Sequence, residues 1–116
     1  MTKKLSETER HQDLAPLLAK GWTAVEGRDA IAKEFKFANF REAMSFMFLV
    51  AFEAEQMDHH PDWKNVYNKV LIELTTHDKG RVTDKDYALA AKIDAIFSIQ
   101  HRNLPNVSFP IPSSPK

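Results

Sequence analysis

The sequence predicts an α+β domain of two layers, in which an antiparallel sheet of about four strands carries three helices on one face. Three observations predict this class. Three segments begin with a helix-capping pattern, and the segments between them alternate apolar and polar residues as strands do. The length of 116 residues, with 43% hydrophobic content, suits one domain that buries a single core.

Each expected helix begins at a residue that can cap it, followed three positions later by a carboxylate. These pairs are Ser6 with Glu9, Asn39 with Glu42, and Thr83 with Asp86. The first helix starts at Glu7, is disturbed at Pro16 and can stop at Gly21. The other two are expected over Phe40 to about Met57 and Asp84 to about Gln100. An apolar stripe at helical spacing runs along the second: Phe40, Ala43, Met44, Met47, Val50, Ala51 and Ala54.

Two segments are typical of strands. "WTAVEGRDAIAKEFKF" contains a turn at residues 26–29 between short alternating stretches. In "VYNKVLIELTTH" one face would carry Val70, Ile72, Leu74 and Thr76, and the other Lys69, Leu71, Glu73, Thr75 and His77. Because the second face includes Lys and Glu, we expect solvent there and helices on the opposite face. The domain covers residues 1–103, and the proline-rich residues 104–116 form a tail.

The composition excludes several classes of function. There are no cysteines, which excludes disulfides, thiol catalysis and cysteine-bound zinc. A formal net charge of zero argues against direct binding to nucleic acid or anionic lipid. No apolar run reaches the ~18 residues of a membrane span, and the first residues lack the apolar centre of a signal peptide. We therefore expect a soluble, cytoplasmic protein.

The stretch "EQMDHHPDW" carries the first candidates for chemistry, His59 and His60, just beyond the second helix, where Pro61 prevents its continuation. Histidine has a reference pKa of ~6.5 and can both give and take protons near neutrality. Adjacent residues in a turn point to different sides, so one can face a ligand while the other orients it. Glu55, one helical turn before His59, is the carboxylate expected to hold that ring. The alternative is that these histidines only cap helix carbonyls.

Further candidates come from the rest of the chain. His77 is expected at the end of the long strand, before a loop that contains Gly80. Asp86 can either bond the backbone N–H of Thr83 as a cap or face the pocket. Trp63 and Trp22 can stack on a flat ligand or belong to the core. We expect no metal, because the histidine spacing matches no helical HxxxH arrangement.

The run "EAEQMDHHPDWKNVYNKVLIELTTHDKGRVTDKDYALAAKID" resembles the core of the pterin-4a-carbinolamine dehydratase family. In animals that family is also known as the dimerisation cofactor of a homeodomain transcription factor. The shared signature is a glutamate, His-His-Pro, an aromatic residue, Asn-Val-Tyr-Asn-Lys-Val, Thr-His, a glycine turn and an aspartate that starts a helix. The resemblance covers roughly Ser6 to Gln100. One departure is Arg81, where the family often has a second glycine, and a positive φ there would strain it.

The resemblance implies removal of water from 4a-hydroxytetrahydropterin to give quinonoid dihydropterin, in tetrahydrobiopterin recycling, without metal or organic cofactor. It implies that His59, poised by Glu55, is the principal acid or base, and that His77 is the second proton-transfer group. His60 would orient the substrate, Asp86 would assist at the pocket rim, and Pro61 with Trp63 or Trp22 would contact the ring.

The same resemblance leaves alternatives open. The chain could act as a non-enzymatic coactivator of a transcription factor, with a nuclear location, through an exposed apolar side of the second helix. It could also bind pterins for another pathway, such as molybdopterin metabolism. A homodimer or homotetramer is expected in each case.

Overall fold

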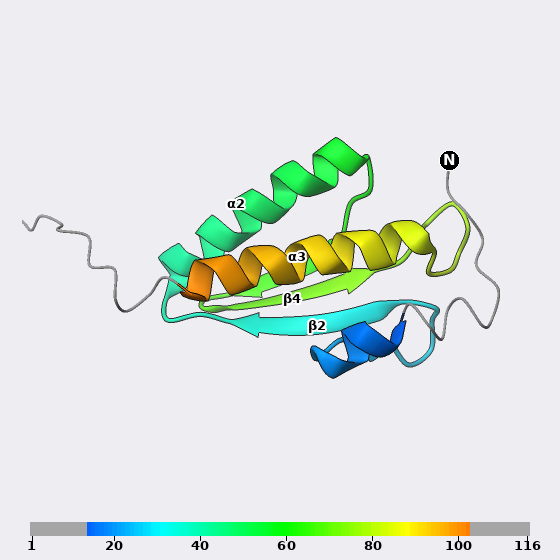
Figure 1. Ribbon diagram of the computed structural model, residues 1–116, viewed down its shortest axis with the longest axis horizontal. Coiled ribbons are helices and arrows are strands. Elements are labelled where there is room, and N and C mark those ends of the chain that lie inside the picture. The colour runs from blue at the N-terminus through cyan, green and yellow to red at the C-terminus, as the bar shows by residue number, and fades with distance from the viewer. Residues whose placement is uncertain (1–13, 103–116) are drawn as a thin grey trace, which may run out of the picture.

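The computed structural model describes residues 14–102. The sheet is antiparallel, with strand order β1-β2-β4-β3, and helices α2 and α3 cover one of its faces (Figure 1). Residues 14–19 form a further short helix that adds to the same core. The elements are β1 (Thr23–Ala24), β2 (Ile31–Lys36), α2 (Phe40–Met57), β3 (Asp62–Val66), β4 (Lys69–Leu74) and α3 (Asp84–Arg102). The predicted α+β class is confirmed; the cap at Ser6 and the tail 104–116 lie outside the described residues.

Helix starts agree with the capping patterns. Asn39 Oδ1 accepts the backbone N–H of Glu42 at 2.9 Å, and Glu42 Oε1 accepts the backbone N–H of Ala38 at 3.2 Å. The first bond satisfies an orphan donor of the first turn, and the second ties the residue before the N-cap to the helix, in a close variant of the capping box. The short helix runs through Pro16, and Gly21, with φ 103°, lies in the turn that follows it.

The core lies between the sheet and the helices. Strand β4 turns Val70, Ile72 and Leu74 to the helices, all fully buried, as the alternation predicts. Helix α2 adds Ala43, Phe46, Val50 and Ala54. The predicted stripe is wrong at its edge: Phe40 and Met44 are 48% and 36% exposed, and Phe46 is the buried anchor. The side of α2 that meets the sheet is thus narrower than the stripe, and large apolar side chains remain on its outer side.

The long strand is shorter than expected. Strand β4 ends at Leu74, and Thr75 and Thr76 are both buried, which breaks the alternation. Thr76 instead pairs with Arg81 in an isolated bridge, so His77 lies in a loop rather than on a strand. Gly80 takes the positive φ of this loop, 66°; Arg81 is not among the described residues with positive φ. The departure from a double glycine therefore causes no backbone strain.

A buried polar cluster joins the start of the described chain to α3. Asp94 on α3 accepts the indole N–H of Trp22 at 2.9 Å and pairs with Lys33 Nζ at 2.8 Å. Trp22 is 0% exposed. Of the two roles considered for Trp22, the core role is correct. The expectation that it forms a flat wall for a ligand is wrong, because no surface of its ring is accessible.

Candidate active site

The end of α2 sets the direction of both adjacent histidines. Asp58 adopts the left-handed conformation, φ 53° and ψ 44°, and its N–H reaches Ala54 O and Glu55 O. The N–H of His59 also bonds Ala54 O, at 3.0 Å. Asp58 thus closes the helix as glycine usually does, and aspartate is among the residues that tolerate this conformation. This closure directs His59 under the helix end and His60 away from it.

His59 is buried and hydrogen bonded to Asp86. The distance from His59 Nε2 to Asp86 Oδ1 is 2.6 Å, and Asp86 is 0% exposed. Its other oxygen, Oδ2, accepts the hydroxyl of Thr76 and the backbone N–H of Thr83, both at 2.8 Å. Asp86 therefore combines its predicted capping role with a second one, as the partner of His59. It lies behind the imidazole rather than at a pocket rim, which corrects that expectation.

Glu55 pairs with His60 instead of His59. The distance from His60 Nε2 to Glu55 Oε1 is 2.9 Å, and the side chains are 58% and 81% exposed. The prediction that Glu55 poises His59 is wrong, because the left-handed residue Asp58 turns His59 inward toward α3. Adjacent side chains do point to different sides, as expected, so each imidazole finds its own carboxylate.

His77 completes a set of three imidazole–carboxylate pairs. Its Nε2 lies 3.4 Å from Asp62 Oδ1, at the start of β3. In all three pairs the imidazole meets its carboxylate through Nε2. For His59 and His60 these contacts are hydrogen bonds, and an Nε2 that donates to its carboxylate leaves Nδ1 as the acceptor of the neutral ring.

The three histidines line one hollow of about 350 Å³ between the end of α2 and the loop after β4. That volume is within the range of small-molecule sites, roughly 300–1,000 Å³. The hollow is lined by Asp58, His59, His60, Thr76, His77, Asp78 and Lys85. The geometry therefore brings together side chains from the end of α2 and the loop after β4, which are separated by the β3–β4 hairpin, and Lys85 from the start of α3.

A family model described as pterin 4 alpha carbinolamine dehydratase matches residues 3–96. The chain belongs to this family. A Drosophila melanogaster pterin-4-alpha-carbinolamine dehydratase is 49% identical over 94 residues, which are 81% of this chain and 49% of that protein. A Dinoroseobacter shibae protein, provisionally named for the same activity, is 51% identical over 94 residues, 81% of this chain and 97% of its own length.

Solved structures agree with the assignment to the family. A Brucella melitensis protein, described as a transcriptional coactivator/pterin dehydratase, superposes with a TM-score of 0.73 at 43% identity, covering 81% of this chain and 98% of its own. A pterin dehydratase-like RuBisCO assembly factor of the alpha-carboxysome shares only the fold, with a TM-score of 0.58 at 23% identity.

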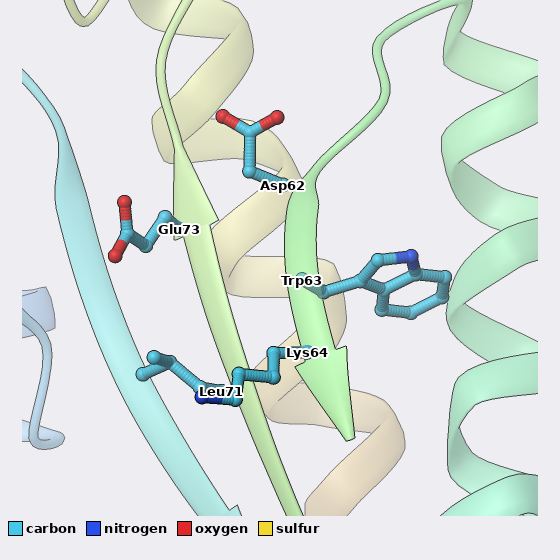
Figure 2. Close-up of a pocket in the computed structure, with 5 residues that line it drawn as sticks. All are labelled: Asp62, Trp63, Lys64, Leu71 and Glu73. Atoms are coloured by element: carbon cyan, nitrogen blue, oxygen red, sulfur yellow. The ribbon is translucent and has the colours of Figure 1, made fainter.

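In this member of the dehydratase family, the tryptophans do not line the histidine hollow. Trp63 is half-buried and packs against the core, and its indole points toward α2 (Figure 2). Its cross-strand partner is Ile72, a residue of the helix-covered face. The expectation that Trp63 forms a flat wall of the ligand site is therefore wrong for this hollow. Pro61, between His60 and β3, is not among the lining residues either.

Sequence reasoning missed four residues of the lining: Asp58, Thr76, Asp78 and Lys85. A usable signal was adjacency, because each of the four directly precedes or follows a predicted site residue.

Among residues 14–102, no three His, Asp or Glu side chains are grouped in a way that could hold a metal ion. Within the same range, no helix is long and apolar enough to cross a membrane.

Proposed function

We propose that this protein is a 4a-hydroxytetrahydropterin dehydratase that uses His59 and His77 for proton transfer. The observation that carries the proposal is the hollow of about 350 Å³ lined by three histidines, each paired with a carboxylate. Membership of the pterin-4a-carbinolamine dehydratase family supports the pterin as substrate.

The reaction needs two proton transfers and no net change in the enzyme. The bond from C4a to oxygen breaks, and the departing hydroxyl takes a proton from an acid to leave as water. The neighbouring N5 loses its proton to a base as the C4a–N5 double bond forms. An imidazole beside a carboxylate can serve either step, and such groups typically contribute ~10²–10⁴-fold.

The environments of the three histidines divide the roles. His59 is buried and rigidly held by Asp86, which suits the principal proton transfer. His77 is 62% exposed and lies on the other segment of the hollow, which suits the second transfer. His60, paired with Glu55 at the surface, suits binding and orientation of the ring. We assign the reaction to tetrahydrobiopterin recycling in the cytoplasm, by a homodimer or homotetramer without a cofactor.

The test follows the dehydration of freshly generated 4a-hydroxytetrahydropterin at neutral pH, with a chelator present and the spontaneous rate subtracted. The wild type is expected to accelerate the reaction. His59→Ala and His77→Ala should each lower turnover about 10²-fold, the lower end of the usual contribution of an acid or base. Lys69→Ala is the control, because Lys69 lies at the other end of β4 from the loop of His77.

A wild type without activity would refute the dehydratase assignment. Losses below about threefold in both histidine variants, with melting curves like that of the wild type, would refute the assignment of these residues. Either outcome is separable from a folding defect, because the melting curve is measured on the same preparations.

A second function is favoured by the outer side of α2. Five large apolar side chains are exposed there: Phe40, Met44, Phe48, Leu49 and Phe52. Apolar surface gathered on one helix is typical of a protein-binding site. Binding to another copy of the chain or to a transcription factor would cover it. Co-purification of a partner that dissociates on Phe48→Glu would support this function, whereas loss of turnover alone in that variant would not.

A further inference from the structure

The start of β3 contains an arrangement that is unfavourable by itself. Asp62 and Glu73 are direct cross-strand partners on the face of the sheet away from the helices (Figure 2). Like charges directly opposite one another destabilise a strand pair. The sheet therefore places two carboxylates where repulsion disfavours them, and a third group must offset that repulsion.

Arg28 is that group. It comes from the turn between β1 and β2, where its Nη2 lies 3.2 Å from Asp62 Oδ2 and its Nη1 lies 3.1 Å from Glu73 Oε1. The turn is itself fixed, because the hydroxyl of Thr75 donates to the carbonyl of Asp29 at 2.7 Å. One guanidinium thus bridges both carboxylates and holds Asp62 by one oxygen.

The other oxygen of Asp62 faces His77. With Oδ2 on Arg28, Oδ1 is directed to His77 Nε2 at 3.4 Å. His77 lies in a loop and is 62% exposed, so packing does not fix its ring as burial fixes His59. Exposed ion pairs such as these add little to stability. We therefore expect these ion pairs to affect the orientation of the His77 ring more than the free energy of unfolding.

We propose that Asp62, held by Arg28, is the positioning residue of His77, turning Nε2 away from the hollow and leaving Nδ1 for the substrate. The inference rests on the proposed dehydratase function for its catalytic consequence, but the orientation of the ring can be measured without it. Asp62 does not touch the reacting atoms; it acts through His77.

The variant Asp62→Asn tests this, because it removes the charge and keeps the shape. Turnover should fall about tenfold, part of the ~10²–10⁴-fold that acid–base groups contribute, while KM stays within about twofold. The double variant Asp62→Asn/His77→Ala should be no slower than His77→Ala alone, since residues that act as one unit are not additive. Glu34→Gln is the matched control, as an exposed carboxylate of β2.

The orientation of the His77 side chain is measured by three-bond NMR couplings, which report its χ1 angle. The wild type and Glu34→Gln should show one rotamer, and Asp62→Asn an average over several. The melting temperature should stay within about 2 °C, as expected for a change well below 1 kcal/mol in a domain of this size.

Three results would overturn the inference: turnover of Asp62→Asn within twofold of the wild type, multiplicative losses in the double variant, or an unchanged rotamer. If the wild type shows no dehydratase activity, the proposed function fails, and the couplings alone decide whether Asp62 positions His77.

Discussion

Asp86→Ala is expected to lower the free energy of unfolding by about 3–5 kcal/mol, because it strands several buried hydrogen-bond donors at once. The side chain is 0% exposed and accepts from the imidazole of His59, the hydroxyl of Thr76 and the N–H of Thr83. Removing it leaves these donors buried without their acceptor, and each such group costs ~1–3 kcal/mol. Urea unfolding followed by circular dichroism measures the change.

Two further variants separate folding from activity. Asp86→Asn keeps the shape and one acceptor, so it should fold yet lose about 10²-fold in turnover, because a neutral amide no longer supports a protonated His59. Asp84→Ala changes a carboxylate in the same first turn of α3 and should cost no more than about 1 kcal/mol. An unfolding midpoint for Asp86→Ala equal to that of Asp84→Ala would contradict the central role of this carboxylate.

Asp94→Ala is expected to destabilise the fold by a similar amount, about 3–5 kcal/mol, without any direct part in the chemistry. Lys33 and Asp94 are 15% and 8% exposed, and their pair is joined by the indole N–H of Trp22. The variant leaves the partly buried ammonium group of Lys33 without its carboxylate. Nζ lies 4.8 Å from the ring centre of Phe35, and this cation–π contact offsets only part of the lost stability.

The double variant Lys33→Met/Asp94→Leu separates charge from packing. Replacing both partners of a buried pair by apolar residues is often neutral, so this variant should recover the part of the loss that comes from the charge, while the indole N–H of Trp22 still lacks its acceptor. It should also retain turnover, since neither residue lines the hollow of the histidines. Equal destabilisation in the single and double variants would show that an uncompensated charge is not responsible, and that packing and the unsatisfied indole N–H account for the loss.

Features set by local hydrogen bonds were predictable from the sequence. The capping pairs at Asn39 and Thr83 involve residues within four positions, so their pattern is visible in the chain itself. The bounds of α2, Phe40–Met57, follow from such a cap and from Pro61, which prevents the helix from continuing. The antiparallel sheet follows from the alternation in β4 and the turn of residues 26–29.

Pairings across the fold were not predictable in the same way. His59 meets Asp86 across 27 positions only because α3 docks with its first turn beneath the end of α2. Glu55 was the nearer carboxylate in sequence, but the left-handed Asp58 turns His59 away from it. The buried indole N–H of Trp22 finds its acceptor in Asp94, 72 positions later. Partners of this kind are selected by tertiary packing, which periodicity and spacing do not encode.

The proposed site requires His59, His60 and His77 to surround one pterin ring. Titration with an unreactive dihydropterin, followed through the imidazole signals in two-dimensional ¹H–¹⁵N spectra, measures this most directly. The signals of all three rings are expected to move together along one saturation curve. Movement of only one ring, or midpoints that differ between the rings, would contradict it.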